Sequence, residues 1–344
     1  MDQRKLKVVF FTRKPRALGN FSVETYFAMV AKSLEQEFEV STVVMPFESK
    51  GLFPRLFNAI YCRYKQGDIN HITGDIHYVA TFLERKKTIL TVLDCGMLQQ
   101  TTGIKRAILK FFWFTLPVRK VRYITAISTA TKNELLRQVK FSASRIEVIY
   151  VCVNELFRPT PKPAYQDGAK VKLLQIGTAP NKNISRLADA LKGLNVELTI
   201  IGKISEELSE KLQKNNIDTI IKDYKLSDQE ILEEYQQTDI LAFVSTIEGF
   251  GMPIVEANKV GRIVVTSNVS SMPEIAGNAA IFVNPSEVAS IRNGFEQAIT
   301  LLKAPAELIE KGKLNAQRFE LEYISNAYAK LYYKIAGRKR KIHE

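Results

Sequence analysis

The chain has 344 residues, which is long for one hydrophobic core and typical of two domains. Its 46% hydrophobic and 25% charged residues are those of an ordinary globular protein and argue against a disordered or fibrous chain. The amino terminus shows no signal-peptide pattern, and no uncharged apolar run reaches the roughly 18 residues of a spanning helix, so we expect a cytoplasmic protein. Three widely spaced cysteines indicate reduced thiols, and with only three histidines they leave little material for a metal site.

The first half of the chain alternates short β-rich runs with helical segments. The β-rich runs are residues 7–11, 39–45, 68–73, 88–93, 123–127 and 145–151. One helix is expected to begin near Ser22, and another to be capped by Ser128. Strands that alternate with helices predict a parallel sheet with helices on both faces.

One polar segment of the first half follows a predicted strand. Residues 71–77 (His-Ile-Thr-Gly-Asp-Ile-His) lie at the carboxyl end of that strand, where open α/β sheets bind ligands. Asp75 and His77 are therefore candidates for contact with a substrate. His71 is expected to end inside the strand and to pack there.

Charge is divided unevenly along the chain. Residues 1–158 hold 25 Lys and Arg against 13 Asp and Glu, whereas residues 159–318 hold 18 against 20. Residues 95–133 contain seven basic residues and no acid, around the aromatic run 111–113, which either dips into a membrane interface or packs on the sheet. We expect an anionic lipid surface as a partner, because no nucleic-acid motif accompanies the charge. The basic face would include Lys105, Arg106, Arg119, Lys120, Arg122, Arg338, Lys339, Arg340 and Lys341.

A proline-rich segment divides the chain. Residues 157–163 hold three prolines in their last five positions and are typical of a stiff linker, so we place the domains at 1–158 and 159–318. Strand and helix signals alternate again in the second half. Its β-rich runs are residues 171–176, 197–201, 219–222, 239–246, 262–266 and 280–283.

The most informative motif is the run 248–256 (Glu-Gly-Phe-Gly-Met-Pro-Ile-Val-Glu), which follows the apolar strand 239–246 and leads into a helix. Gly249 and Gly251 let the backbone turn sharply and approach a ligand. Pro253 suits the first position of a helix. The free N–H groups of that helix start favour an anion such as a diphosphate.

Two carboxylates flank this turn. Glu248 lies at the strand end and Glu256 is expected within the first helical turn, so both would face one pocket. They suit sugar and ribose hydroxyls as acceptors, although the same pair could merely cap the helix and complement its dipole. Lys182 follows a turn at Gly177 and precedes a helix; it either neutralises diphosphate charge or is a solvated loop lysine.

The Glu-x7-Glu spacing, continued by residues 257–261 and 271–277, resembles the retaining family 4 glycosyltransferases. The resemblance is firm over 171–285 and loose before 150. It implies an α/β fold with two doubly wound Rossmann-like domains facing across a cleft, the GT-B architecture. It also implies that the final helix, within 319–344, crosses back to the first domain.

The resemblance implies a retaining, metal-independent enzyme without cofactors, which moves a sugar from a UDP- or GDP-sugar to an acceptor hydroxyl of a glycan or lipid-linked glycan. Bacterial-type surface polysaccharide assembly is the implied setting, in the cytoplasm or on the inner face of the plasma membrane. Glu248 would contact the donor sugar and Glu256 the ribose. Gly19 stands where the family carries a glycine-rich loop facing the donor phosphates, or it is only a turn glycine. The residues expected to bind the donor are Gly19, Lys182, Gly249, Phe250, Gly251, Met252, Pro253, Ile254 and Glu256.

The sequence departs from the family pattern at two positions. Thr178 replaces an arginine, and Leu93 replaces a histidine that contacts the donor sugar. Asp94 or His77 is expected to take over that contact, as catalytic candidates beside Glu248. The departures also leave open a weak or inactive protein that only binds nucleotide sugars.

Glu274 lies in a segment that matches the family, but a structural role is expected for it. Ser271 and Glu274 have the spacing of a capping box at a helix start, with a proline inside the first turn.

Overall fold

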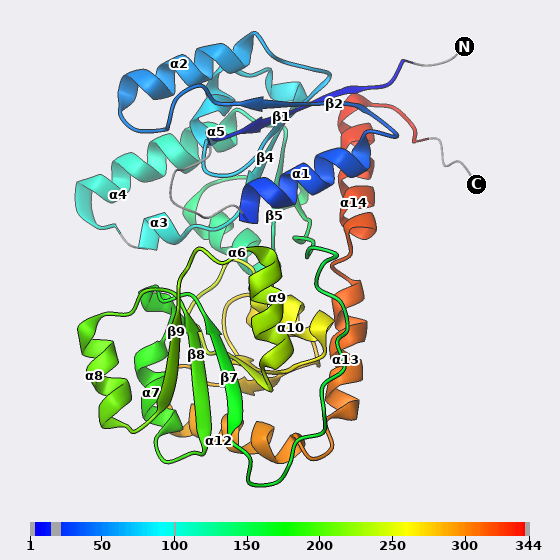
Figure 1. The fold of residues 1–344 in the computed structure, drawn as a ribbon. Coiled ribbons are helices and arrows are strands. Elements are labelled where there is room, and N and C mark those ends of the chain that lie inside the picture. The colour runs from blue at the N-terminus through cyan, green and yellow to red at the C-terminus, as the bar shows by residue number, and fades with distance from the viewer. Residues whose placement is uncertain (1–3, 15–21, 100, 341–344) are drawn as a thin grey trace. The chain divides into compact units, whose positions relative to one another are not determined.

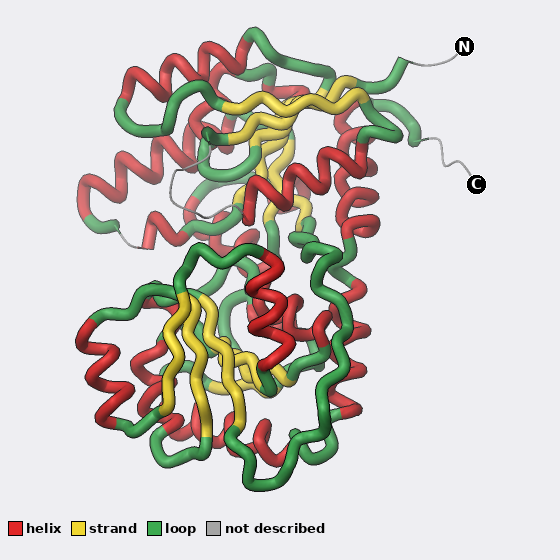
Figure 2. Tube along the Cα trace, in the orientation of Figure 1, coloured by secondary structure: helices red, strands yellow, loops and turns green. Residues whose placement is uncertain are grey.

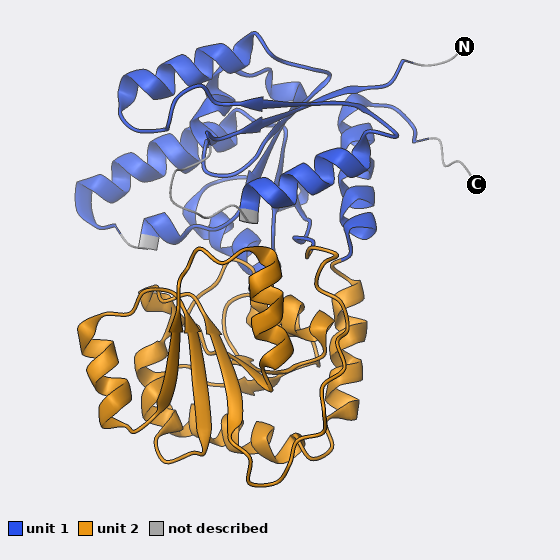
Figure 3. Cartoon of the chain, in the orientation of Figure 1, with its two compact units in different colours: residues 1–152, 320–344 blue, residues 153–319 orange. Residues whose placement is uncertain are grey.

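The computed structural model describes residues 4–14, 22–99 and 101–340. The chain forms two compact units (Figure 3): unit 1 comprises residues 1–152 and 320–344, and unit 2 comprises residues 153–319. Each unit contains one parallel six-stranded sheet flanked by helices (Figures 1 and 2). The expected α/β class with two doubly wound units is therefore confirmed.

The sheet of unit 1 has the strand order β2-β1-β3-β4-β5-β6. Its strands are β1 Lys7–Thr12, β2 Glu39–Val44, β3 Ile69–Ile72, β4 Thr88–Val92, β5 Tyr123–Ala126 and β6 Ile146–Val148. Its α-helices are α1 Ser22–Leu34, α2 Leu52–Arg63, α3 Gly96–Gln99, α4 Gly103–Leu109, α5 Leu116–Arg119, α6 Thr129–Gln138 and α14 Leu321–Ala336. Shorter helical turns are η1 His77–Phe82, η2 Arg85–Lys87, η4 Ala143–Arg145 and the π-helical η3 Lys110–Thr115. Every residue of β3 and β4 is buried, including the polar residues Asn70, His71, Thr88 and Thr91.

The last helix, α14, is part of the core of unit 1. Tyr328 and Tyr332 are fully buried, and the Tyr328 hydroxyl lies 3.2 Å from that of Tyr26 on α1. His71 of β3 connects the helix to the sheet, with Nδ1 at 2.7 Å from the Tyr332 hydroxyl and Nε2 at 2.7 Å from Thr91 Oγ1. Burial lowers the pKa of His71 to about 3, so the imidazole is neutral. The expectation that His71 packs is confirmed.

Unit 2 has the strand order β12-β11-β10-β7-β8-β9. Its strands are β7 Val171–Ile176, β8 Val196–Ile201, β9 Asp218–Lys222, β10 Ile240–Phe243, β11 Ile263–Ser267 and β12 Ile281–Val283. Its helices are α7 Ile184–Leu191, α8 Glu206–Lys214, α9 Asp228–Gln237, α10 Met252–Val260, α11 Met272–Ala276, α12 Val288–Leu301 and α13 Ala306–Gln317, with the turn η5 Pro180–Lys182. The strand order reverses between β7 and β10: β8 and β9 lie on one side of β7, and β10, β11 and β12 lie on the other.

The proline-rich segment lies against unit 2. Phe157 packs its ring on Tyr235 at 5.8 Å between centroids, and Thr160 donates its N–H to the Val260 carbonyl at 3.2 Å. Lys162 forms an ion pair with Asp239. These contacts explain why the division between the units falls after Cys152, six residues before the expected boundary.

Two smaller expectations are also answered. Ser128 caps α6, accepting the N–H of Thr131 at 3.0 Å. The three cysteines (Cys62, Cys95 and Cys152) are buried free thiols. Within the described ranges, no helix is long and apolar enough to cross a membrane.

Candidate functional site

The candidate site lies where the strand order of unit 2 reverses, at the carboxyl ends of β7 and β10. Open α/β sheets bind ligands at such a switch point, because the loops that follow the two strands diverge there. The loop after β7 contributes Lys182, and the loop after β10 contributes Glu248. The two loops are joined directly, since Thr246 donates its N–H to the Asn181 carbonyl at 2.8 Å.

The turn from β10 into α10 depends on glycine at one position. Gly251 has a φ of +111°, which other residues rarely adopt, and an added Cβ would lie 3.2 Å from Ile254 Cδ1. Pro253 lies in the first turn of α10, and Phe250 and Ile254 are buried. Gly249, Phe250, Gly251, Met252 and Ile254 thus shape the turn and the helix start that carry the two glutamates.

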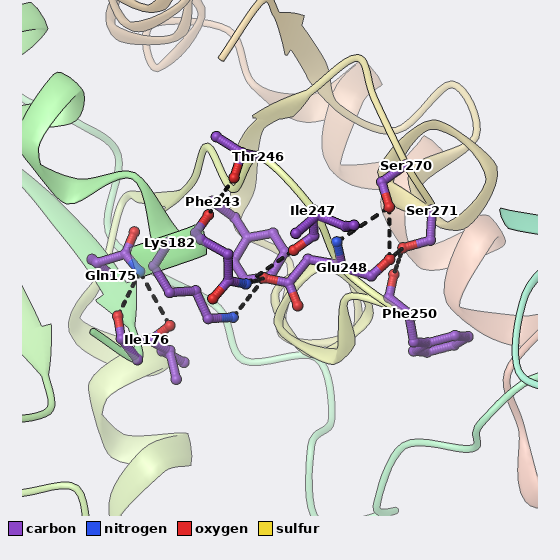
Figure 4. Close-up of polar contacts among 12 residues, drawn as sticks. Gln175, Ile176, Lys182, Phe243, Thr246, Ile247, Glu248, Phe250, Ser270 and Ser271 are labelled. Atoms are coloured by element: carbon purple, nitrogen blue, oxygen red, sulfur yellow. Dashed lines mark hydrogen bonds and ion pairs between the residues drawn. The ribbon is translucent and has the colours of Figure 1, made fainter. Parts of the chain in front are cut away.

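Hydroxyl groups from the loop after β11 hold the backbone of Glu248 (Figure 4). Ser270 Oγ donates to the Glu248 carbonyl at 2.7 Å and lies 3.2 Å from the Glu248 N–H. Ser271 Oγ lies 3.0 Å from the Glu248 carbonyl and 2.6 Å from that of Phe250. The expected capping box is therefore wrong: the Ser271 hydroxyl bonds to the turn that bears Glu248, and α11 has no side-chain cap.

Lys182 and Glu248 form an ion pair across the switch point (Figure 4). The Lys182 Nζ lies 2.7 Å from Glu248 Oε1, and the two side chains are only 17% and 15% exposed. Asn181 Nδ2 donates to the Ile247 carbonyl at 2.9 Å and lies 3.3 Å from the same Glu248 oxygen. The Lys182 ammonium also lies 4.6 Å from the centre of the Phe243 ring. Both charges are thus held in a partly buried position.

Glu256 is the fifth residue of α10, so it lies in the second helical turn and not in the first, as the sequence had suggested. Its side chain is buried, and Oε2 accepts a hydrogen bond of 2.8 Å from the Tyr235 hydroxyl of α9. Burial raises the pKa of Glu256 to about 7, while the Tyr235 hydrogen bond and the Lys182 charge act to lower it. The ammonium that pairs with Glu248 therefore also acts on Glu256.

The glycine-to-lysine loop after β7 is closely packed. Gly177 has a φ of +82°, and a Cβ there would lie 3.0 Å from Lys182 Cε, so the lysine side chain passes over this glycine. Thr178, the residue that departs from the family pattern, packs on Gly202, where a Cβ would lie 2.8 Å from Thr178 Cγ2. Thr178 therefore has a packing role at the end of β8.

The candidates of unit 1 differ in exposure. His77 is buried, its Nδ1 lies 2.7 Å from the Trp113 carbonyl, and its ring packs edge-on against Phe114. Burial lowers the pKa of His77, while the carboxylates of Asp75 and Asp94 act in the opposite direction. Asp94 is exposed, and its Oδ1 accepts the Gly96 N–H at 2.7 Å. Gly19 lies outside the described residues.

The expected basic face is only partly free for a partner. Arg122 donates to the Ile335 carbonyl at 3.1 Å, Arg340 pairs with Glu37 at 2.8 Å, and Arg106 donates to the Leu98 carbonyl at 3.0 Å. Lys105, Arg119 and Lys120 are exposed, whereas Lys341 is outside the described part of the chain.

The aromatic run 111–113 is divided between the two roles left open by the sequence. Trp113 packs on the unit and donates its Nε1–H to the Asp75 carbonyl at 3.0 Å, while Phe111 and Phe112 are exposed.

Sequence reasoning missed Asn181, Tyr235, Ser270 and the role of Ser271. The contacts of Tyr235 and the serines join segments that lie 21 to 23 residues apart, and no local spacing signals them. Asn181 stands next to Lys182, so its place in the loop was the only available signal. Among the described residues, no group of three or more His, Cys, Asp or Glu is placed to hold a metal ion.

Two Rossmann-like units, each with its own parallel sheet, define the class of the protein, and solved structures agree. A glycosyltransferase from Rickettsia africae ESF-5 matches with a TM-score of 0.75 at 19% identity, over 98% of this chain and 100% of that chain. HepE from Anabaena, in complex with UDP and glucose, matches with a TM-score of 0.73 at 17% identity, over 96% of this chain and 100% of that chain. The fold is that of the GT-B glycosyltransferases.

Residues 163–315 match the family model of the glycosyl transferases group 1. Unit 2 therefore contains the domain that this family model describes, within a chain whose two units together have the GT-B fold.

Curated relatives match in part. The serotype-specific mannosyltransferase WbdA of Escherichia coli is 28% identical over 200 residues, which are 52% of this chain and 24% of that protein. The MMP alpha-(1->4)-mannosyltransferase of Mycolicibacterium hassiacum is 26% identical over 222 residues, 60% of this chain and 51% of that protein. The GDP-mannose:cellobiosyl-diphosphopolyprenol alpha-mannosyltransferase of Komagataeibacter xylinus is 27% identical over 115 residues, 33% of this chain and 29% of that protein. The matches thus span about half or less of these relatives.

Proposed function

We propose that the chain is a retaining glycosyltransferase that moves a sugar from a nucleoside diphosphate sugar to an acceptor hydroxyl. The observation that carries the proposal is the group Lys182, Glu248 and Glu256 at the switch point of unit 2, which offers one cation and two carboxylates. A nucleotide sugar needs a cation for its diphosphate and acceptors for its sugar and ribose hydroxyls. The names of the relatives favour mannose as the sugar, and one of them favours GDP as its carrier.

Each residue has a separate task in the proposed reaction. The Glu248 carboxylate accepts hydroxyl groups of the donor sugar, and Glu256 accepts those of the ribose. The bond between the anomeric carbon and the diphosphate oxygen breaks, and the acceptor oxygen bonds to that carbon on the same face. The acceptor proton passes to the departing diphosphate. Lys182 and the first N–H groups of α10 stabilise the negative charge of the leaving group, a role that metals take elsewhere, so we propose that no metal is needed.

Asp94 and His77 stay candidates for the sugar or acceptor contact that the family assigns to unit 1. Asp94 is favoured, because its carboxylate is exposed, whereas one ring nitrogen of His77 is already bonded to the Trp113 carbonyl.

The proposed acceptor is a glycan carried on a lipid. One relative is named for a diphosphopolyprenol acceptor, and unit 1 carries the excess of basic residues. Cations near an anionic bilayer favour reversible docking, which would bring the protein to an acceptor that cannot leave the membrane.

A ligand screen followed by a product assay tests the proposal. The thermal stability of the full chain is compared with UDP, GDP, ADP and dTDP, where a ligand at about 100 times its Kd should add roughly 2.7 kcal/mol. Sugar transfer is then measured with the matching nucleotide sugars. Stabilisation by no nucleoside diphosphate would overturn the proposal. Binding without transfer or hydrolysis would identify a binding protein, the alternative that Thr178 and Leu93 keep open.

A further inference from the structure

Helix α2 of unit 1 turns an apolar face to solvent. Leu52 is 75% exposed and Phe53 is 83% exposed. The apolar residues that share this face, named here the outer face of α2, are Leu52, Phe53, Leu56, Phe57, Ile60 and the adjoining Tyr64. On a helix of 100° per residue they fall within an arc of about 140°. Side chains of this size are ordinarily placed on the core side of a helix in a globular protein.

The opposite side of α2 is fixed to the unit by a polar anchor. Asn58 is fully buried; its Oδ1 accepts the Phe47 N–H at 3.2 Å, and its Nδ2 donates to the Phe47 carbonyl at 2.9 Å and lies 3.1 Å from the Tyr78 hydroxyl. Ala59 and Cys62 are buried on the same side. Rotating the helix to bury its apolar face would break these bonds and leave buried polar groups unpaired. The outward direction of the apolar face is therefore built into the fold.

Positive charge predominates beside this face, although Glu48 pairs with Lys50 just before α2. Residues 49–67 hold four Lys and Arg and no acid, and Arg63 and Lys65 are exposed beside the apolar residues. Arg55 lies over the Trp113 ring at 4.4 Å, which connects α2 to the acid-free segment 95–133.

That segment adds to the same kind of surface. Ile104 and Ile108 of α4 and Phe111 and Phe112 of η3 are exposed, and Lys105 is exposed among them. Both α2 and α4 lie on the side of unit 1 away from α14 (Figure 1).

We infer that the outer face of α2 inserts into the headgroup region of an anionic lipid bilayer, with Arg63 and Lys65 contacting the headgroups. A helix with an apolar face rimmed by cations lies in a membrane interface, where apolar burial and attraction to anionic lipid act together. A second copy of the chain is the poorer occupant, because it would bring a second set of cations against the first. The inference rests on the proposed function only for its purpose, which is access to a lipid-linked acceptor; the face itself stands on geometry.

Co-flotation of the full chain with vesicles tests the inference. Vesicles of phosphatidylcholine with phosphatidylglycerol are compared with phosphatidylcholine alone, for the wild type and for the double variant F53S/F57S. Because two phenyl rings leave the interface, partitioning onto anionic vesicles should fall about 10- to 100-fold. Leu314→Ser on α13 of unit 2 is the matched control, since Leu314 is also an exposed apolar helical residue, and it should partition like the wild type. The charge variant R63Q/K65Q should also bind more weakly and show a weaker dependence on salt concentration.

Two results would overturn the inference. One is equal partitioning of the wild type and F53S/F57S, including binding by neither. The other is a wild-type dimer in sedimentation velocity that F53S/F57S converts to a monomer, because a second copy would then cover the face. Thermal stabilisation by nucleoside diphosphates separates this inference from the proposed function. F53S/F57S should be stabilised as much as the wild type. A wild type that no nucleoside diphosphate stabilises would count against the proposed function alone.

Discussion

Each unit has an ion pair at the point where its strand order reverses, but the number of carboxylates beside the cation differs between the units. In unit 1 the chain reverses direction between β1 and β3, and Arg13, which follows β1, pairs with Glu24 and lies 3.5 Å from Asp75, which follows β3. In unit 2 the corresponding pair is Lys182 with Glu248. One sheet design thus carries a cation and a carboxylate at both switch points.

The difference between the two units lies in the carboxylates that surround the cation. Arg13 stays protonated, pairs with Glu24 and lies close to a second carboxylate, that of Asp75. Lys182 pairs with one carboxylate, that of Glu248. Its second acidic neighbour, Glu256, has a pKa of about 7, so this carboxyl group is partly protonated at neutral pH. We therefore expect a structural role for the cluster of unit 1, and we propose that a diphosphate can replace Glu248 as the partner of Lys182.

Removing the Glu248 carboxylate gives the largest effect expected from this comparison of the two ion pairs. Glu248→Gln should lower transfer activity at least about 100-fold, because the sugar loses a charged acceptor that is preorganised beside the leaving group. Sugar transfer under saturating donor gives kcat.

Glu274→Gln is the control for that variant, since Glu274 lies on the neighbouring helix α11 and is not assigned a contact with the donor. A Glu248→Gln enzyme within a few-fold of the wild type would contradict the role of Glu248.

The sequence predicted the strand and helix pattern well, because buried parallel strands tend to be apolar runs, as β10 (Ile240–Phe243) within the predicted run 239–246 shows. It also brought Lys182 and Glu248 to one site, although they are 66 residues apart, because both follow strands. It could not predict that the two would pair, or that Tyr235 would bond to Glu256, since such contacts depend on how helices pack. The outward face of α2 was also missed: periodicity shows that a helix is amphipathic, but not which face meets the core.

The cluster of unit 1 should matter for stability. Arg13→Gln removes the guanidinium that pairs with Glu24 and lies near Asp75, and should lower the free energy of unfolding by about 1 to 3 kcal/mol. Chemical denaturation measures the change, and the double variant R13Q/E24Q should recover part of it. Unchanged stability with lost nucleoside diphosphate binding would show that the cluster of unit 1 binds ligand, contrary to the comparison.

A substitution at Gly177, over which the Lys182 side chain passes, distinguishes backbone strain from loss of ligand binding. Gly177→Ala forces a residue with a Cβ to a φ of +82° and displaces the lysine side chain, which passes 3.0 Å from the new atom. We expect a loss of about 1 to 2 kcal/mol in stability from the backbone. Gly193→Ala is matched, since Gly193 has a φ of +76° and no atom within 4 Å of the new Cβ. Only Gly177→Ala should also weaken nucleoside diphosphate binding; equal binding by the two variants would mean that Lys182 does not contact the diphosphate.

The smallest effect concerns the buried carboxylate of Glu256. Because folding raises its pKa from 4.5 to about 7, the folded state keeps a proton that the unfolded chain releases, and the group costs stability as the pH rises through that window. Ribose hydroxyls bond best to the ionised form, so nucleoside diphosphate affinity should rise several-fold as the pH passes about 7. Tyr235→Phe removes a hydrogen bond that lowers this pKa and should move the rise to higher pH. Calorimetric titration across this range measures both. Glu256→Gln retains the titration of the ligand phosphate alone, and a rise that survives in this variant would assign the pH dependence to the ligand.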